Sequence, residues 1–249
     1  MKQPARPPLI PQPMRSLRGN EPIIGVPDAT VVDFWRFAMP DIRMNNTRGL
    51  FAEFLVHQAI GSHEPRVEWA SHDVETNDGL RIEVKASGYL QAWEQRTPSQ
   101  IRFSGLRART WSPDDGYSGA KSCNADVYVF AVQTAREHAA YNPLDTAQWE
   151  FYVLPHPVVA ALDADSASLG AVRAAAGPPV SFATLSDCIR SADPRPGATG
   201  DWRDPPATTV PDTGVKHGQH RCPAVEYSPA ALADETAAQP KDGTSPPAP

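Results

Sequence analysis

Residues 73–85, which read DVETNDGLRIEVK, predict a β-hairpin. The segment NDG at 77–79 fits a three-residue hairpin loop, in which a type I turn precedes a residue of positive φ, usually glycine. With this loop Thr76 lies opposite Leu80, and the numbers of every facing pair sum to 156. The turn therefore predicts the register of both strands.

This register places three charged residues together. Asp73 lies opposite Glu83, and Lys85 follows Glu83 by two residues. Side chains alternate along a strand, so we expect these three to share one side of the hairpin. A two-residue loop would instead place Asp73 on the opposite face from Glu83. The other face is wholly apolar and is expected to be core: Leu80, Ile82, Val84 and Ala86.

Such a set suits metal-dependent chemistry on phosphate. Two neighbouring carboxylates repel each other unless they are protonated or bridged by a cation. Mg²⁺ is bound by one or two carboxylates, with water and substrate phosphate completing an octahedral shell. A lysine beside the ion can hold the attacking water and offset charge in the transition state. Together these groups favour in-line hydrolysis of a phosphodiester.

A further carboxylate, Glu53, lies 20 residues before Asp73 in the segment RGLFAEFLVHQAI, which predicts a helix. Its helical neighbours, three and four residues away, are mostly apolar. A carboxylate in such surroundings needs a partner. A metal ion or its bound water would be one.

The order Glu53, Asp73, Glu83-Val84-Lys85 resembles the PD-(D/E)xK nucleases, the restriction-endonuclease-like superfamily. The segments RGLFAEFLV and IEVKAS are similar to those of bacterial members in particular, and the resemblance covers roughly residues 46–155. One departure is a histidine, rather than the frequent proline, directly before Asp73.

The resemblance implies a role for each residue. Asp73 and Glu83 would bind Mg²⁺ or Mn²⁺, with the Val84 carbonyl as a further ligand and Glu53 supporting the metal shell. Lys85 would serve the attacking water. The implied activity is metal-dependent hydrolysis of DNA, by an endonuclease rather than an exonuclease.

Three alternatives stay open. Cross-strand charge pairs on a solvated hairpin face would give the same pattern. The fold could be retained without catalysis, as a nucleic-acid-binding or protein-binding module. The chain could also act only as a homodimer or within a larger assembly, with its ends as tethers.

A basic window is a candidate for binding nucleic acid. Residues 96–109 contain four arginines and no acidic residue. Arginine among polar and aromatic side chains suits contacts with phosphate, whereas the alternative is a solvated strand and loop. Gln91 loosely matches a glutamine that some members of the superfamily carry after the lysine. The candidate nucleic-acid-binding residues are Gln91, Arg96, Arg102, Arg107 and Arg109.

The remaining pattern predicts an α/β fold. The order of helix, hairpin, strands and helices favours a mixed β-sheet covered on both faces, a three-layer α/β/α sandwich with a restriction-endonuclease-like core. Helices are expected at 28–37, from Asn46 or Thr47 to Gly61, within 160–176, and after Ser181; strands are expected at 101–108, 126–133 and 149–154.

Proline marks the ends of this domain. The chain has 249 residues and 27 prolines, which gather in 1–27 and 191–249. We therefore expect one folded domain at 28–190 between two disordered tails. The second tail holds His217, His220 and Cys222, a grouping that chance in a low-complexity segment explains.

Composition excludes several classes. No apolar run is long enough to span a bilayer, and the N-terminus lacks the apolar core of a secretory signal. Three scattered cysteines form no disulfide framework, which is typical of the cytoplasm. The net charge of −6 means that binding to nucleic acid would need a local patch.

Overall fold

The computed structural model describes residues 16–62, 66–67, 70–112 and 116–196. The chain forms two compact units, residues 1–40 and 41–249, which are described separately. Most of both expected tails, including the His217 grouping, lies outside the described residues.

The first unit contains one described helix, α1 (Val31–Ala38). The carboxylate of Asp33 accepts hydrogen bonds from the N–H and the hydroxyl of Thr30, at 2.9 and 2.6 Å. Asp28, the expected start, has a φ of +57° and cannot be helical. The helix therefore begins later than the sequence predicts, at the first residue after Thr30.

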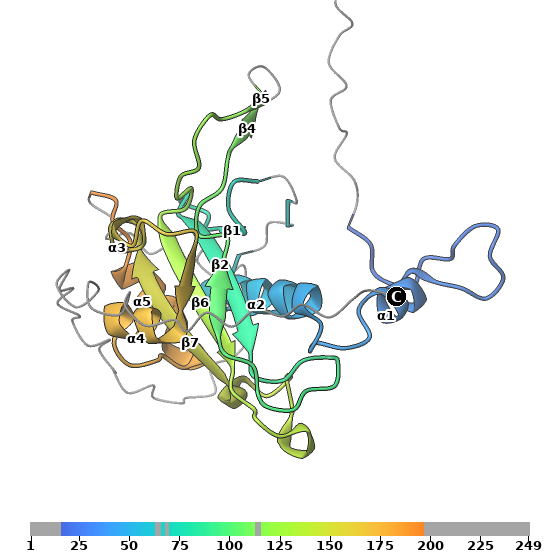
Figure 1. Cartoon of the computed structure of the whole chain (residues 1–249). Helices are drawn as coiled ribbons and strands as arrows, with labels where there is room; N and C mark the ends of the chain where they lie inside the picture. Colours follow the sequence, from blue (N-terminus) through green and yellow to red (C-terminus); the bar gives the residue numbers. More distant parts are fainter. Residues whose placement is uncertain (1–15, 63–65, 68–69, 113–115, 197–249) are drawn as a thin grey trace, which may run out of the picture. The chain divides into compact units, whose positions relative to one another are not determined.

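The second unit contains a mixed four-stranded sheet (Figure 1). Its order is β1-β2-β6-β7, with a parallel pair in the middle and antiparallel pairs on both sides. These strands are β1 (Val74–Glu75), β2 (Arg81–Gly88), β6 (Val127–Gln133) and β7 (Trp149–Pro155). Two small antiparallel pairs are β3 (Arg102–Ser104) with β8 (Ser166–Ser168), and β4 (Trp111–Ser112) with β5 (Gly116–Tyr117).

The predicted hairpin register is confirmed. Val74 pairs with Ile82, and the N–H of Thr76 donates to the carbonyl of Leu80 at 3.1 Å. Gly79 has a φ of +83°, which a residue with a Cβ rarely adopts. The loop chemistry therefore fixes which residues of β2 face the core.

Helices follow the prediction in part. The remaining helices are α2 (Asn45–Ile60), α3 (His156–Ala161), α4 (Leu169–Ala176), α5 (Phe182–Ser191) and two short 3₁₀ turns, η1 (His138–Ala140) and η2 (Thr146–Gln148). Helix α2 ends before Gly61, as expected, at a φ of +66°. It begins earlier than expected, because the N–H of Arg48 already donates to the carbonyl of Met44 at 2.8 Å. Helix α5 follows Ser181, as predicted.

The expected helical region 160–176 is interrupted. Strand β8 separates α3 from α4 because it pairs with β3, more than 60 residues earlier. The hydroxyl of Ser168 then accepts a hydrogen bond from the N–H of Ala171 at 3.1 Å and begins α4. Likewise, the strand predicted at 101–108 is limited to Arg102–Ser104.

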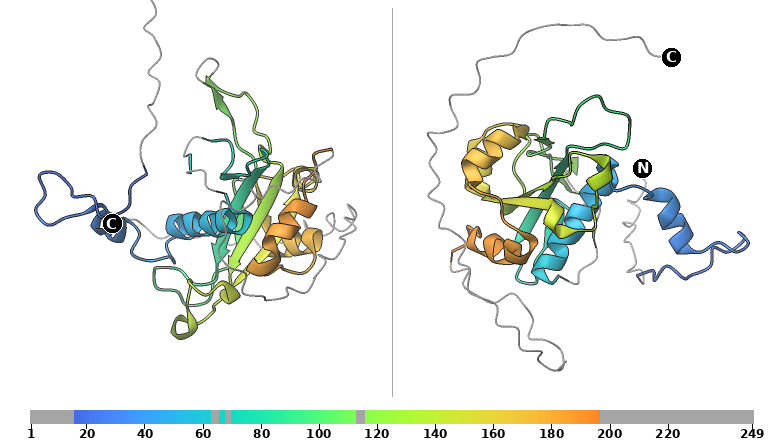
Figure 2. Two further views of the ribbon diagram at one scale, coloured as in Figure 1. Left: turned by 180° about the vertical axis from the view of Figure 1, so that it is seen from behind. Right: turned by 90° about the horizontal axis from the view of Figure 1, so that it is seen from below.

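Two hydrophobic clusters pack against the sheet. The first joins residues of α2 and α5 with the side chains of Ile82, Val84 and Val129, and Figure 2 shows these two helices lying beside each other. The second joins residues of α3, α4 and β3 with Tyr128 and Phe130, which alternate with the first set along β6. The prediction that the even-numbered residues of β2 face the core is confirmed, although Ala86 is only half-buried.

Two expectations from the composition concern membrane-spanning helices and the cysteines. None of the described helices is both long and apolar enough to cross a bilayer. Cys123, in the described part of the chain, is a free thiol.

Replacing Phe130 tests the core at the centre of the sheet. Its side chain is fully buried and its ring meets that of Phe103 edge-on, with 5.0 Å between centroids. We expect Phe130→Ala to lower the free energy of unfolding by about 3–5 kcal/mol, measured by denaturant titration. The control Phe37→Ala removes a side chain that is 83% exposed and should cost less than about 0.5 kcal/mol. Equal losses in the two variants would contradict this packing.

Candidate active site at the edge of β2

The predicted charged set comes from three elements. Glu53 lies on α2, Asp73 directly precedes β1, and Glu83 and Lys85 lie on β2. Burial raises the pKa of both glutamates, the negative charge of Asp73 raises both further, and the Lys85 ammonium lowers both. Such mutual effects require short distances. The structure therefore brings all four residues into one electrostatic neighbourhood.

Asp73 is held where β1 begins. Its N–H donates to the carbonyl of Ile82 at 3.1 Å, and its carboxylate accepts from the N–H of Val84 at 2.8 Å. The aspartate side chain thus takes the place of the next backbone partner in the ladder. Both bonds fix the carboxylate beside β2.

The Val84 carbonyl points to the side of β2 on which Asp73 lies. Within a strand, the N–H and C=O of one residue point to the same side, and those of the next residue to the other. The Arg81 carbonyl accepts from the N–H of Asp126, and so faces β6. The Val84 N–H reaches Asp73, on the opposite side. The backbone oxygen of Val84 therefore lies on the side where Asp73 stands.

Glu83 and Lys85 form an ion pair. The Lys85 Nζ donates to Glu83 Oε1 at 2.5 Å, and the two side chains are 21% and 16% exposed, respectively. Burial, followed by the charge of Asp73, raises the pKa of Glu83 to about 6 despite the lysine. Glu83 thus loses its proton less readily than an exposed glutamate.

Glu53 has a cation partner that the sequence does not identify. Arg66, in the connection between α2 and β1, donates from Nε to Glu53 Oε2 at 2.6 Å. Burial raises the pKa of Glu53, as does Asp73, and the Arg66 guanidinium lowers it. The only signal for Arg66 in the sequence is its position between the two acidic residues.

The donor set suits a divalent ion, but the site is not preassembled. Within the described residues, no group of three or more His, Cys, Asp and Glu side chains is positioned to hold a metal. Glu53 and Glu83 are instead paired with Arg66 and Lys85. Carboxylate and carbonyl oxygens are the ligands that Mg²⁺ prefers. The same oxygens could serve a metal once these two cations move away.

The candidate nucleic-acid-binding residues differ in their surroundings. Gln91 is buried, and its amide donates to the Gly88 carbonyl and the Ser99 hydroxyl, so it holds a loop together. Arg102 donates to Ser166 at 2.8 Å, and Arg107 pairs with Asp163 at 2.7 Å. Arg96 and Arg109 are exposed.

The segment that carries three of these arginines approaches the charged set. A Cβ added to Gly105, directly after β3, would lie 3.8 Å from the Lys85 Nζ. Gly105 has a φ of +73°, which favours glycine. Nothing in the sequence signals this approach, because it depends on how β3 packs beside β2.

The chain matches no protein-family model and no curated protein.

The raised pKa of Glu83 predicts a pH-dependent stability. Between its ordinary value of 4.5 and about 6, the folded chain keeps a proton that the unfolded chain releases. Folding therefore loses stability as pH rises through this window, by about 2 kcal/mol. From pH 4.5 to pH 7, we expect the free energy of unfolding of Glu83→Gln to rise by about this amount relative to that of the unsubstituted chain. Denaturant titration in EDTA measures this difference. If the difference in free energy of unfolding between the two chains stays constant or shrinks over this pH range, the burial of a charged Glu83 is contradicted.

Proposed function

We propose that the chain is a PD-(D/E)xK nuclease that hydrolyses phosphodiester bonds of DNA with Mg²⁺ or Mn²⁺, as an endonuclease of the cytoplasm. One observation carries the proposal. The sequence pattern singles out Glu53, Asp73, Glu83 and Lys85, and in the structure Lys85 pairs directly with Glu83 while the charge of Asp73 raises the pKa of both glutamates, beyond the effect of burial.

The proposed fold is the three-layer sandwich of the restriction-endonuclease-like core. Two hydrophobic clusters on opposite faces of the mixed sheet support it, since α2 and α5 contribute to one and α3 and α4 to the other. In this arrangement α2 delivers Glu53 to the edge of the sheet that carries Asp73.

In the proposed mechanism Asp73, Glu83 and the Val84 carbonyl would hold the metal, and Glu53 would support the metal shell. The metal, when bound, polarises the phosphoryl oxygen and lowers the pKa of the attacking water. Lys85 leaves Glu83 and holds that water in line with the scissile bond. Its positive charge also offsets the charge that develops on the phosphate.

Cleavage of circular DNA tests the activity. Purified full-length chain is incubated with closed circular and linear duplex DNA in Mg²⁺, Mn²⁺ or EDTA. We expect metal-dependent nicking of the circle and a loss of at least about 100-fold in Asp73→Asn and Lys85→Ala. Glu137→Gln, which neutralises an exposed glutamate, serves as the matched control and should retain activity.

Two outcomes would contradict the proposal. If the unsubstituted chain binds DNA but cleaves none with any metal, the alternative of a nucleic-acid-binding module without catalysis is favoured. If Lys85→Ala cleaves at the rate of the unsubstituted chain, the role of Lys85 is wrong.

Metal binding should also stabilise the fold independently of activity. At a Mg²⁺ or Mn²⁺ concentration 100 times its Kd, we expect a gain of about 2.7 kcal/mol in the free energy of unfolding. At a fixed metal concentration the gain should rise from pH 5 to pH 7, because Glu83 loses its proton over this range and the Kd falls. Asp73→Asn should remove it in a thermal-melting titration, whereas an undiminished gain would place the metal elsewhere.

A further inference from the structure

A two-stranded arm leaves the second unit between β3 and β6 and projects beyond the end of the main sheet (Figures 1 and 2). It runs from Ala108 to Ser122, and β4 and β5 are its strands; residues 113–115 lie outside the described part of the chain. The N–H groups of Ala108 and Ser122 each donate to the other's carbonyl at 3.0 Å. The arm is thus a hairpin with a defined base.

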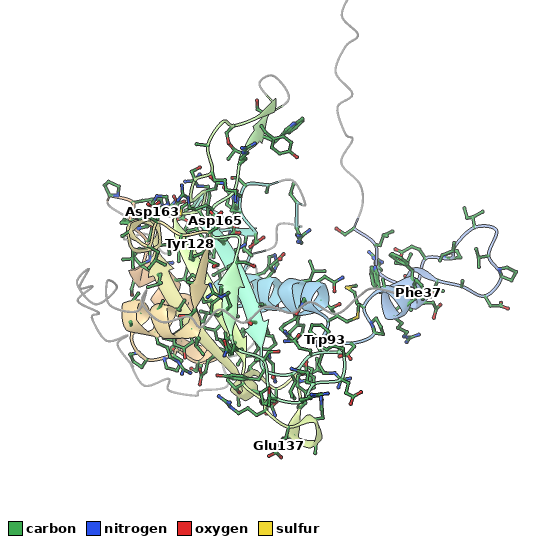
Figure 3. The ribbon with its side chains drawn as sticks, in the orientation of Figure 1. Phe37, Trp93, Tyr128, Glu137, Asp163 and Asp165 are labelled. Atoms are coloured by element: carbon green, nitrogen blue, oxygen red, sulfur yellow. The ribbon has the colours of Figure 1, made fainter. Side chains whose placement is uncertain are left out.

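Two exposed ion pairs link this base to a neighbouring connection. Arg107, directly before the arm, pairs with Asp163 at 2.7 Å, and Lys121 pairs with Asp165 at 2.6 Å. Figure 3 labels both aspartates, which lie in the connection between α3 and β8. An isolated two-stranded hairpin is only marginally stable in water. The side chain of Asp163 is 88% exposed and that of Asp165 is 56% exposed, so water screens both pairs and each contributes little to the position of the arm.

The arm carries exposed aromatic rings. Trp111 and Tyr117 lie directly opposite each other, so both side chains project from the same face. Trp111 is 54% exposed and Tyr117 is 62% exposed. Arg109, two residues before Trp111 and outside β4, is exposed. The arm also contains two acidic residues, Asp114 and Asp115, which lie outside the described part of the chain.

The arm begins close to the proposed active site. Gly105, whose added Cβ would lie 3.8 Å from the Lys85 Nζ, is three residues before its base. An extended chain rises about 3.3 Å per residue, so Trp111 lies at most about 20 Å from Gly105. At 3.4 Å per nucleotide, this distance spans roughly six nucleotides of one strand.

We propose that Trp111 and Tyr117 stack against unpaired bases, so that the preferred substrate is DNA with a single-stranded segment beside a duplex. This inference rests on the proposed function for its choice of DNA. Aromatic rings stack on any base, but a duplex hides the faces of its bases from them. Arg109 would contact the phosphates beside the stacked bases. The arm and active site then bind one strand on both sides of the duplex boundary, with cleavage at most about six nucleotides from the stacked base.

Binding to two DNA probes tests the proposal. Fluorescence anisotropy compares the full-length chain on a forked duplex and on a blunt duplex of equal length, in EDTA so that nothing is cleaved. We expect about tenfold tighter binding to the fork. Trp111→Ala and Tyr117→Ala should each weaken fork binding by about tenfold and leave duplex binding unchanged. Trp111→Phe should retain most of the preference, and Trp93→Ala, which removes a ring that is 57% exposed, serves as the matched control.

The outcomes separate this inference from the proposed function. Equal affinity for fork and duplex, or a fork preference unchanged in both arm variants, overturns the inference even when cleavage depends on Lys85. A fork preference that depends on Trp111 supports it, even if no metal gives cleavage and the nuclease proposal fails. Thermal melting of each variant identifies any loss of folding.

Discussion

Asp73 binds β2 through both its backbone and its side chain. Its N–H donates to the Ile82 carbonyl at 3.1 Å, and its carboxylate accepts from the Val84 N–H at 2.8 Å. These bonds require the hairpin register that the loop before Leu80 sets. A slip by one residue would turn Glu83 to the apolar face and Val84 to the charged one. The fold and the candidate site thus depend on the same turn.

Charge balance is the second condition for the site. Three carboxylates lie at a partly buried edge, where burial and the charge of Asp73 raise the pKa of both Glu53 and Glu83. Arg66 and Lys85 offset part of that cost by direct pairing. A divalent ion would offset it more fully and would leave both cations available for phosphate. The chain's net charge of −6 is therefore compatible with binding DNA at this edge.

Local chemistry explains which features the sequence predicts well. Gly79 and Gly61 adopt left-handed conformations, so the hairpin and the end of α2 follow from short segments. The grouping of Asp73 with Glu83 and Lys85 follows from strand alternation. In contrast, β8 forms because distant β3 pairs with it, and no pattern within 160–176 reveals that partner. The sequence pattern likewise does not reveal the contact between Arg66 and Glu53, or the burial of Gln91 in its loop.

The central claim is that one divalent ion binds between Asp73 and Glu83. An anomalous-difference map from crystals containing Mn²⁺ tests it most directly. We predict a single strong peak coordinated by both carboxylates and the Val84 carbonyl, at about 2.0–2.2 Å, with the Lys85 Nζ turned away from Glu83. A map without a peak there, with Glu83 still paired to Lys85 at a saturating Mn²⁺ concentration, would contradict the account.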